Sequence, residues 1–169
     1  MQMRMLRVFD GKDYTEDMPV FKKHAVRAII VRDGKIAMQQ SREGEYKILG
    51  GGVDKGETFH EALAREVLEE SGLMIKEETI REIGEVLEVR RDCFDPDLKY
   101  ECHSFFYFCD AKEEMGEPAM TPSEIAKGFH LVWASPREII EGNQAFLNQR
   151  WIYRDTEIIR MFYEGKLKE

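Results

Sequence analysis

Three consecutive glycines stand directly before a glutamate-rich segment, and this feature constrains the fold more than any other. Gly50, Gly51 and Gly52 carry no side chain, so the backbone there can turn back on itself and present its amides or carbonyls to a ligand. Residues 58–71 are rich in Glu, Ala, Leu and Arg and are followed by Gly72, which predicts a helix with a glycine C-cap. The sequence therefore predicts a glycine loop that leads into a helix.

The predicted helix concentrates negative charge on one face. Residues 51–73 contain six acids and two bases, which sum to −4, half of the net charge of −8. At about 100° per residue, Glu66, Glu69 and Glu70 share one arc of the helix, beside an apolar arc. Like charges at this spacing repel one another. A solvated helix face is one interpretation of these glutamates, and a site for a hard cation such as Mg²⁺, which prefers oxygen ligands, is the other.

The rest of the pattern predicts an α+β fold, an α/β/α sandwich with a mixed β-sheet. Asp33-Gly34 favours a tight hairpin between two of its strands. The sequence contains no repeat or linker, so we expect a single domain over residues 1–169, with residues 1–20 as an N-terminal extension. Strands are predicted at 26–31, 35–40, 47–49, 80–90, 99–110 and 129–133, helices at 58–71, 135–140 and 144–166, and loops at 92–98 and 111–127.

Composition and charge exclude several classes of function. The chain is 43% hydrophobic and 34% charged, which is typical of a folded protein. Its apolar runs, such as 105–109, are far shorter than the ~20 residues that a membrane span requires. The excess of 33 acids over 25 bases, without a basic cluster, disfavours long nucleic acids and membranes as partners. Residues 1–13 lack the apolar stretch of a secretory signal, so we expect a cytoplasmic location.

The cysteines and histidines show no metal-ligand spacing. Cys93, Cys102 and Cys109 cannot all pair within one chain, and their spacing matches neither a zinc knuckle nor a redox pair. We expect them to be reduced and mostly buried in strands. The four histidines receive no role.

Residues 51–73, called the box below, resemble the signature of the Nudix hydrolases. The family pattern is Gly, five residues, Glu, seven residues, Arg-Glu, an aliphatic residue, any residue, Glu-Glu, any residue, Gly and an aliphatic residue. The chain departs from the family at Leu49, where a proline is frequent. The pattern itself is satisfied at every fixed position, by Gly51, Glu57, Arg65-Glu66-Val67, Glu69-Glu70 and Gly72-Leu73.

This resemblance implies a metal-dependent pyrophosphohydrolase. Its substrate would be a nucleoside diphosphate linked to another group, as in a nucleoside triphosphate, a nucleotide sugar or a dinucleotide. Such a reaction requires that the charge on phosphate oxygens be neutralised and that a water be positioned and deprotonated. By resemblance, Glu66 is the base and Arg65 pairs with Glu57 to brace the loop against the helix. The implied ligands of Mg²⁺ or Mn²⁺ are Glu66, Glu69, Glu70 and the Gly50 carbonyl.

Residues outside the helix are further candidates. The family often recruits another acid from a distant loop, and Glu124 is the candidate for this catalytic role, in competition with Glu113, Glu114 and Glu117. Tyr46 and Trp133 are candidates for stacking on a base, whereas most rings of the aromatic run 105–108 are expected in the core. The candidates for substrate binding are Gly51, Gly52, Arg42, Lys47 and Arg27.

Two other functions compete with hydrolysis. A catalytically silent nucleotide-binding sensor or scaffold would have the same fold, but such members usually lose carboxylates that this chain retains. An isomerase of isoprenoid diphosphates would need its own cysteine and histidines, and the three cysteines do not provide that setting. Substrate choice is expected to reside in residues 41–46, 92–100 and 111–127. A homodimer through residues 1–20 or an exposed strand is compatible with the sequence.

Overall fold

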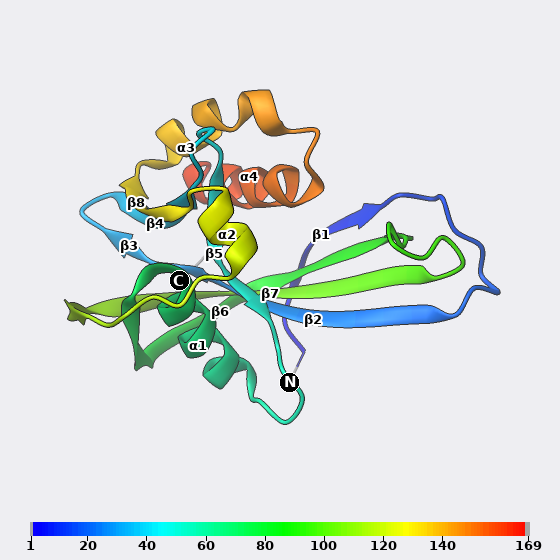
Figure 1. Cartoon of the computed structure of the whole chain (residues 1–169), viewed down its shortest axis with the longest axis horizontal. Helices are drawn as coiled ribbons and strands as arrows, with labels where there is room; N and C mark the ends of the chain where they lie inside the picture. The colour runs from blue at the N-terminus through cyan, green and yellow to red at the C-terminus, as the bar shows by residue number, and fades with distance from the viewer. Residues whose placement is uncertain (1, 168–169) are drawn as a thin grey trace.

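The computed structural model describes residues 2–167, which form one mixed eight-stranded sheet and its helices (Figure 1). No helix in this part of the chain has the length and apolar character that a membrane crossing needs. The elements, in chain order, are β1 (Met5–Asp10), β2 (Val20–Ile29), β3 (Val31–Arg32), β4 (Lys35–Gln40), β5 (Tyr46–Gly52), α1 (Phe59–Ser71), β6 (Leu73–Arg91), β7 (Lys99–Met115), α2 (Pro122–Ala126), β8 (His130–Ala134), α3 (Pro136–Gly142), the 3₁₀ turn η1 (Gln144–Phe146) and α4 (Arg150–Tyr163).

The sheet has the strand order β1-β6-β7-β2-β5-β4-β3, and β8 pairs with β4. Two of its pairings are parallel, β1 with β6 and β2 with β7, whereas the others are antiparallel. Helix α1 lies on one side of the sheet, and α3 and α4 lie on the other (Figure 1). The predicted α/β/α sandwich with a mixed sheet is therefore confirmed.

Each face of the sheet has its own hydrophobic core, because side chains alternate along a strand. On β2, Val26 and Ala28 join the core beneath α1, whereas Ile29 joins the core beneath α4. The aromatic run 105–108 fills both cores, as predicted. The main residues that the helices contribute are Leu63 and Val67 from α1 and Ile158 and Ile159 from α4.

The hairpin predicted at Asp33-Gly34 is confirmed. Val31 and Arg32 pair with Ile36 and Lys35, and the turn residues have φ angles of 52° and 75°. Positive φ at both central positions is the geometry of the favoured two-residue hairpin turn.

Some elements differ from the sequence prediction, and for β1 and β7 the reason is that pairing between distant strands overrides local propensity. Strand β1 lies within the predicted N-terminal extension and pairs with residues 85–89 of β6. Residues 111–115 were expected in a loop but continue β7, since Ala111 and Met115 pair with the start of β6. The C-terminal helix begins at Arg150 instead of residue 144, after a separate 3₁₀ turn.

Strands β1, β2, β6 and β7 extend together beyond the helices and form a projecting arm (Figure 1). The turn between β6 and β7 lies at its far end and carries Phe94, which is 93% exposed. It also carries Cys93, which is exposed, so the expectation of a buried strand residue was wrong there. Cys102 and Cys109 are buried in β7, and all three cysteines are free.

Candidate functional site

The three glycines predicted in a loop lie instead at the end of β5, where they pair with residues 25–27 of β2. Two of them make close approaches to their neighbours. Gly50 has a φ of 146°, and a Cβ on it would lie 2.0 Å from the Val26 carbonyl oxygen of the neighbouring strand. A Cβ on Gly51 would lie 2.5 Å from the carboxylate of Glu66. The end of β5 therefore leaves a space at Gly51 that this carboxylate fills.

Helix α1 is fixed at both ends by its own residues. The Thr58 hydroxyl accepts a hydrogen bond from the Glu61 amide, and the Glu61 carboxylate accepts one from the Thr58 amide, which is a capping box. At the other end Gly72 has a φ of 80° and donates its N–H to the Leu68 carbonyl, so the predicted glycine C-cap is confirmed. These caps fix the orientation of the glutamates between them.

Arg65 is the centre of an ion-pair network inside the box. Its Nε and Nη2 donate to the two carboxylate oxygens of Glu57 at 2.6 and 2.9 Å, and Nη2 also donates to the Gly52 carbonyl. Its Nη1 donates to Glu66 at 2.9 Å and to Glu69 at 3.3 Å. The Arg65 hydrogen bond lowers the pKa of Glu57 to about 2. The structure thus brings Glu57 and Arg65 together across the loop and the helix.

Glu70 lies deeper than the other two glutamates of its face. Its side chain is 5% exposed, its Oε1 accepts from the Gly50 amide at 2.7 Å, and its Oε2 lies 3.4 Å from the Lys47 Nζ. Burial raises the pKa of Glu70 to about 7, against the opposing effects of Lys47 and the Gly50 amide. Burial also raises the pKa of Glu66. These carboxylates therefore sit where a nearby cation would stabilise their charge.

Glu124 lies beside Glu70, although the two are far apart in sequence. Burial raises the pKa of Glu124, but hydrogen bonds with the Thr121 backbone and the Glu70 side chain outweigh this effect and leave it below its usual value. The competing candidates are exposed on or just after the end of β7, and none has a hydrogen bond to Glu70 in the described residues. These are Glu113, Glu114 and Glu117.

Gln39 joins the two acids and was missed by sequence reasoning. It is fully buried on β4, and its Nε2 donates to the Glu70 carbonyl at 3.2 Å and to the Glu124 Oε2 at 3.3 Å. A buried glutamine in a strand matches no motif, so the only signal was a polar residue at an inward position. The amide ties the end of α1 to the segment that carries Glu124.

The cationic candidates have separate positions. Lys47 contacts Glu70, and the Arg27 Nη1 donates to the Gly50 carbonyl at 3.1 Å. Arg42 lies apart from the glutamates, in a different pocket beside Lys127. Neither stacking candidate reaches the glutamates. Tyr46 packs against α3 at Gly142, and the Trp133 ring lies under the Arg32 guanidinium.

The glutamates do not form a ready-made metal cluster. In the described residues, no three His, Cys, Asp or Glu side chains are arranged to hold a metal ion. Their oxygens take other donors instead, because Arg65 bonds to Glu66 and Glu69 while Glu70 turns to the Gly50 amide. The residues nevertheless fit a hard divalent cation in their chemistry. Three carboxylates repel one another on one helix face, and the Glu66 carboxylate fills the space that the missing side chain of Gly51 leaves.

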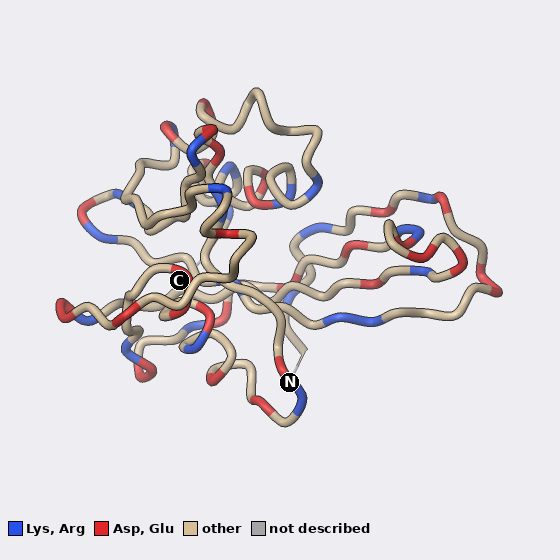
Figure 2. Tube along the Cα trace, in the orientation of Figure 1, with Lys and Arg blue, Asp and Glu red and all other residues tan. Residues whose placement is uncertain are grey.

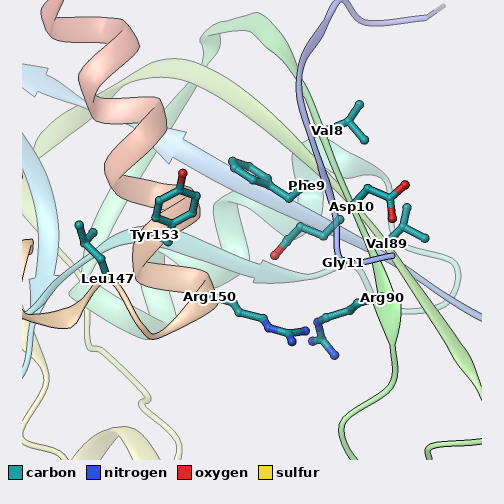
Figure 3. Close-up of a pocket in the computed structure, with 10 residues that line it drawn as sticks. Val8, Phe9, Asp10, Gly11, Val89, Arg90, Leu147, Arg150 and Tyr153 are labelled. Atoms are coloured by element: carbon teal, nitrogen blue, oxygen red, sulfur yellow. The ribbon is translucent and has the colours of Figure 1, made fainter. Parts of the chain in front are cut away.

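Two other pockets lie beyond the carboxylate face of α1, and one of them is lined in part by Asp54 and Glu57 of the box. One of about 450 Å³ lies between β1, β6 and the start of α4, where the guanidinium groups of Arg90 and Arg150 point toward each other (Figure 3). Another of about 880 Å³ extends along the projecting arm, from Phe59 at the start of α1 to Phe94 in the β6–β7 turn. Acidic and basic residues are interspersed along the described trace, without an extended basic stretch (Figure 2).

Comparison with known proteins agrees with this architecture. The NUDIX domain family matches the chain over residues 22–155. Over 50 residues the chain is 46% identical to the NAD-capped RNA hydrolase NudC of Escherichia coli O1:K1 / APEC, a match that covers 28% of this chain and 20% of that protein. NudC of Klebsiella pneumoniae (strain 342) matches to the same extent. The chain thus spans about a fifth of the length of these curated relatives.

Solved structures share the fold over a larger part of the chain. A NUDIX hydrolase from Nitrosomonas europaea superposes with a TM-score of 0.60 at 21% identity, covering 87% of this chain and 92% of that one. A structure described as an ADP compounds hydrolase gives a TM-score of 0.57 at 15% identity, with 87% and 76% covered. At such identities the likeness shows the fold alone.

The family match covers most of the chain and includes the whole box, so the chain belongs to the NUDIX family. This is a family of hydrolases that act on phosphoanhydride bonds, and its members generally require divalent metal ions. The family and the fold class predicted from the sequence are therefore both confirmed.

Proposed function

We propose that this chain is a metal-dependent pyrophosphohydrolase that cleaves the diphosphate linkage of a nucleoside diphosphate joined to another group. The observation that carries the proposal is the fit between the glycines at the end of β5 and α1. A Cβ on Gly51 would occupy the space of the Glu66 carboxylate, and Glu69 and Glu70 share the same helix face. Such a fit is expected if the carboxylates have a ligand to hold, and a merely solvated face would not need it.

Each residue then has a definite task. Glu66, Glu69, Glu70 and the Gly50 carbonyl would hold Mg²⁺ or Mn²⁺, which would supply charge neutralisation at the phosphate oxygens and a more acidic water. Glu66 would accept the proton of the attacking water with a carboxylate oxygen. Glu57 and Arg65 brace the end of β5 against α1, and Glu124 acts as the remote acid. The residues that bind substrate are Gly51, Gly52, Lys47 and Arg42.

The substrate class has support from the names of similar proteins. The curated relatives are described as hydrolases of NAD-capped RNA, and one structural neighbour as a hydrolase of ADP compounds. Both descriptions name nucleotide compounds with a diphosphate. For this chain we propose a small nucleotide-type substrate, in a cytoplasmic protein without nucleic-acid or membrane partners, because the net charge is −8 and the basic residues are dispersed. A homodimer through residues 1–20 or an exposed strand is part of the same proposal.

A panel of nucleoside triphosphates, nucleotide sugars and dinucleotides tests the proposal. Phosphate or pyrophosphate release is measured with Mg²⁺, with Mn²⁺ and with EDTA, for the wild type and for Glu69→Gln and Glu70→Gln. We expect release from one class of substrate, and its loss in EDTA and in both variants. Glu78→Gln is the matched control, since Glu78 is exposed on β6 away from the site, and it should retain full activity.

The sensor or scaffold function makes the opposite prediction. A folded wild-type protein that binds metal and nucleotide but releases no product from any substrate would favour the silent alternative. Unaltered turnover in Glu69→Gln or Glu70→Gln would contradict the metal-ligand assignment, even if the wild type is active.

A further inference from the structure

A cationic pocket adjoins the proposed active site. Its volume is about 260 Å³, and it lies where β2, β5 and β8 meet α2 and the first turn of α4. We call it the arginine pocket. Its main lining residues are Arg27, Lys47, Glu124, Phe129, Trp151 and Arg154. Lys47 forms an ion pair with Glu70, and Glu124 forms a hydrogen bond with the Glu70 side chain. The pocket is therefore continuous with the carboxylate face of α1.

Arg154 supplies a fixed guanidinium with one donor to spare. The side chain is only 5% exposed, its Nε bonds to Asp155 at 3.0 Å and its Nη1 to Glu88 at 3.1 Å. Asp155 is itself held by the Ile48 amide, which donates to its Oδ2 at 2.9 Å. The Nη2 atom of Arg154 is buried and has no hydrogen-bond partner among residues 2–167. A buried donor without an acceptor is unfavourable, so this atom points to a missing ligand.

Arg27 also has a buried donor without a hydrogen-bond partner in the described residues, and it has fewer hydrogen bonds than Arg154. Its Nη1 donates to the Gly50 carbonyl, while its Nε is buried without a partner in the described part of the chain. Its guanidinium forms no ion pair with a carboxylate in that part of the chain. An arginine does not lose its proton in proteins. Asp155 and Glu70 balance the charge of Arg27 only without direct contact, so an anion in the pocket would supply a direct partner.

The lining as a whole is strongly cationic. Four of its eight residues are basic, namely Arg27, Lys47, Lys127 and Arg154, and only Glu124 is acidic. Guanidinium groups match the oxygens of phosphate in geometry and bind them with short, charge-assisted hydrogen bonds. The rings of Phe129 and Trp151 supply apolar walls on which the rest of a ligand can lie.

We propose that the arginine pocket binds a phosphate group of the substrate that is not part of the cleaved diphosphate. This inference rests on the proposed function, because it assigns the diphosphate to the carboxylate face of α1. The preferred substrate is then a nucleoside diphosphate whose linked group carries its own phosphate. Arg27 and Arg154 recognise that phosphate, and Lys47, which contacts Glu70, spans the two subsites.

Binding of inorganic phosphate to the metal-free protein tests the pocket without any turnover. Calorimetry in EDTA compares the wild type with Arg27→Gln, which removes the charge, and with Arg27→Lys, which restores it. We expect the dissociation constant for phosphate to rise at least tenfold in Arg27→Gln and to recover partly in Arg27→Lys. Circular dichroism and thermal unfolding establish that each variant is folded.

Two control variants locate the phosphate. Lys35→Gln removes an exposed cation of the β3–β4 hairpin, and Arg150→Gln removes a cation from the neighbouring pocket of Figure 3. Neither should change phosphate binding. A wild type that does not bind phosphate, equal binding by Arg27→Gln, or a loss only in Arg150→Gln would overturn the proposal.

A pair of substrates completes the test in the presence of Mg²⁺. The two are a nucleotide sugar and the same compound with a phosphate on the sugar. The wild type should prefer the phosphorylated compound in kcat/KM, and Arg27→Gln should reduce that preference at least tenfold. An Arg27→Gln enzyme that changes its preference between nucleobases but keeps its preference for the phosphate would overturn the proposal. If neither compound is cleaved although phosphate binds at Arg27, the proposed hydrolysis fails while the phosphate site stands.

Discussion

The box and the arginine pocket hold their charges in different ways. In the box, Arg65 bonds to residues no more than 13 positions away in the chain. In the arginine pocket, the Arg154–Glu88 pair spans 66 positions and the Ile48–Asp155 hydrogen bond spans 107. The first network is assembled by one loop and one helix, and the second exists only once β5, β6 and α4 have packed together. We therefore expect damage to the box to affect chemistry first, and damage to the ion pairs of the pocket to affect stability first.

The largest expected effect is on stability, at Asp155. This carboxylate is fully buried between Arg154 and the Ile48 amide, so Asp155→Ala leaves a buried guanidinium without its closest partner. Breaking a buried pair in this way should lower the free energy of unfolding by about 3–5 kcal/mol, measured by urea denaturation. Glu157→Ala is the control, because its ion pair with Arg7 is partly exposed and should contribute about 0–1 kcal/mol. Equal losses of unfolding free energy in Asp155→Ala and Glu157→Ala would contradict the expectation that the ion pairs of the arginine pocket matter first for stability.

The next effect is on activity, at Gly51. A Cβ there would meet the Glu66 carboxylate, which has to shift in Gly51→Ala. Misplacement of a reacting group by about 1 Å costs about 100-fold in rate, so we expect kcat/KM of Gly51→Ala to fall by about 100-fold. The midpoint of urea unfolding should stay close to that of the wild type. Glu78→Gln is the control, since Glu78 is exposed on β6 and has no contact with the box in the described residues. A Gly51→Ala enzyme with wild-type turnover would show that the fit between β5 and α1 has no part in catalysis.

The smallest expected effect is at the start of α1. Thr58→Ala removes the hydroxyl that accepts from the Glu61 amide and should lower the free energy of unfolding by about 1 kcal/mol. Thr58→Ser keeps the hydroxyl and should behave like the wild type in the same denaturation experiment. A loss from Thr58→Ala as large as that from Asp155→Ala would mean that the box contributes as much to stability as the pocket does.

The same contrast explains what the sequence could predict. The box, the hairpin at Asp33-Gly34 and the C-cap at Gly72 depend on neighbours in the chain, so their residues are found together in the sequence. Arg154 and Asp155 look like ordinary helix charges, and only their position beside Ile152 and Ile158 on the buried side of α4 distinguishes them. The roles of the predicted site residues, and the extent of the domain over residues 1–169, stay predictions.

Gln39 and the parallel strand β1 show why the rest could not be predicted. Gln39 owes its two hydrogen bonds to the packing of β4 against α1 and α2, which no periodicity records. Strand β1 is made of residues that alternate without a strong apolar pattern, and it is strand only because β6 offers it a free edge. Both features depend on contacts between segments that are far apart in the chain, and local propensity does not reflect such contacts.

The arrangement of the cysteines gives the molecule a built-in position for a spectroscopic probe. Cys93 is exposed at the tip of the projecting arm, whereas Cys102 and Cys109 are buried, and burial raises the pKa of Cys109 to about 12. A thiol-reactive fluorophore should therefore attach at one place in the unmodified protein, because the reactive species is the exposed thiolate. Energy transfer between labelled copies would then report whether two arm tips approach each other in solution, without any engineered residue.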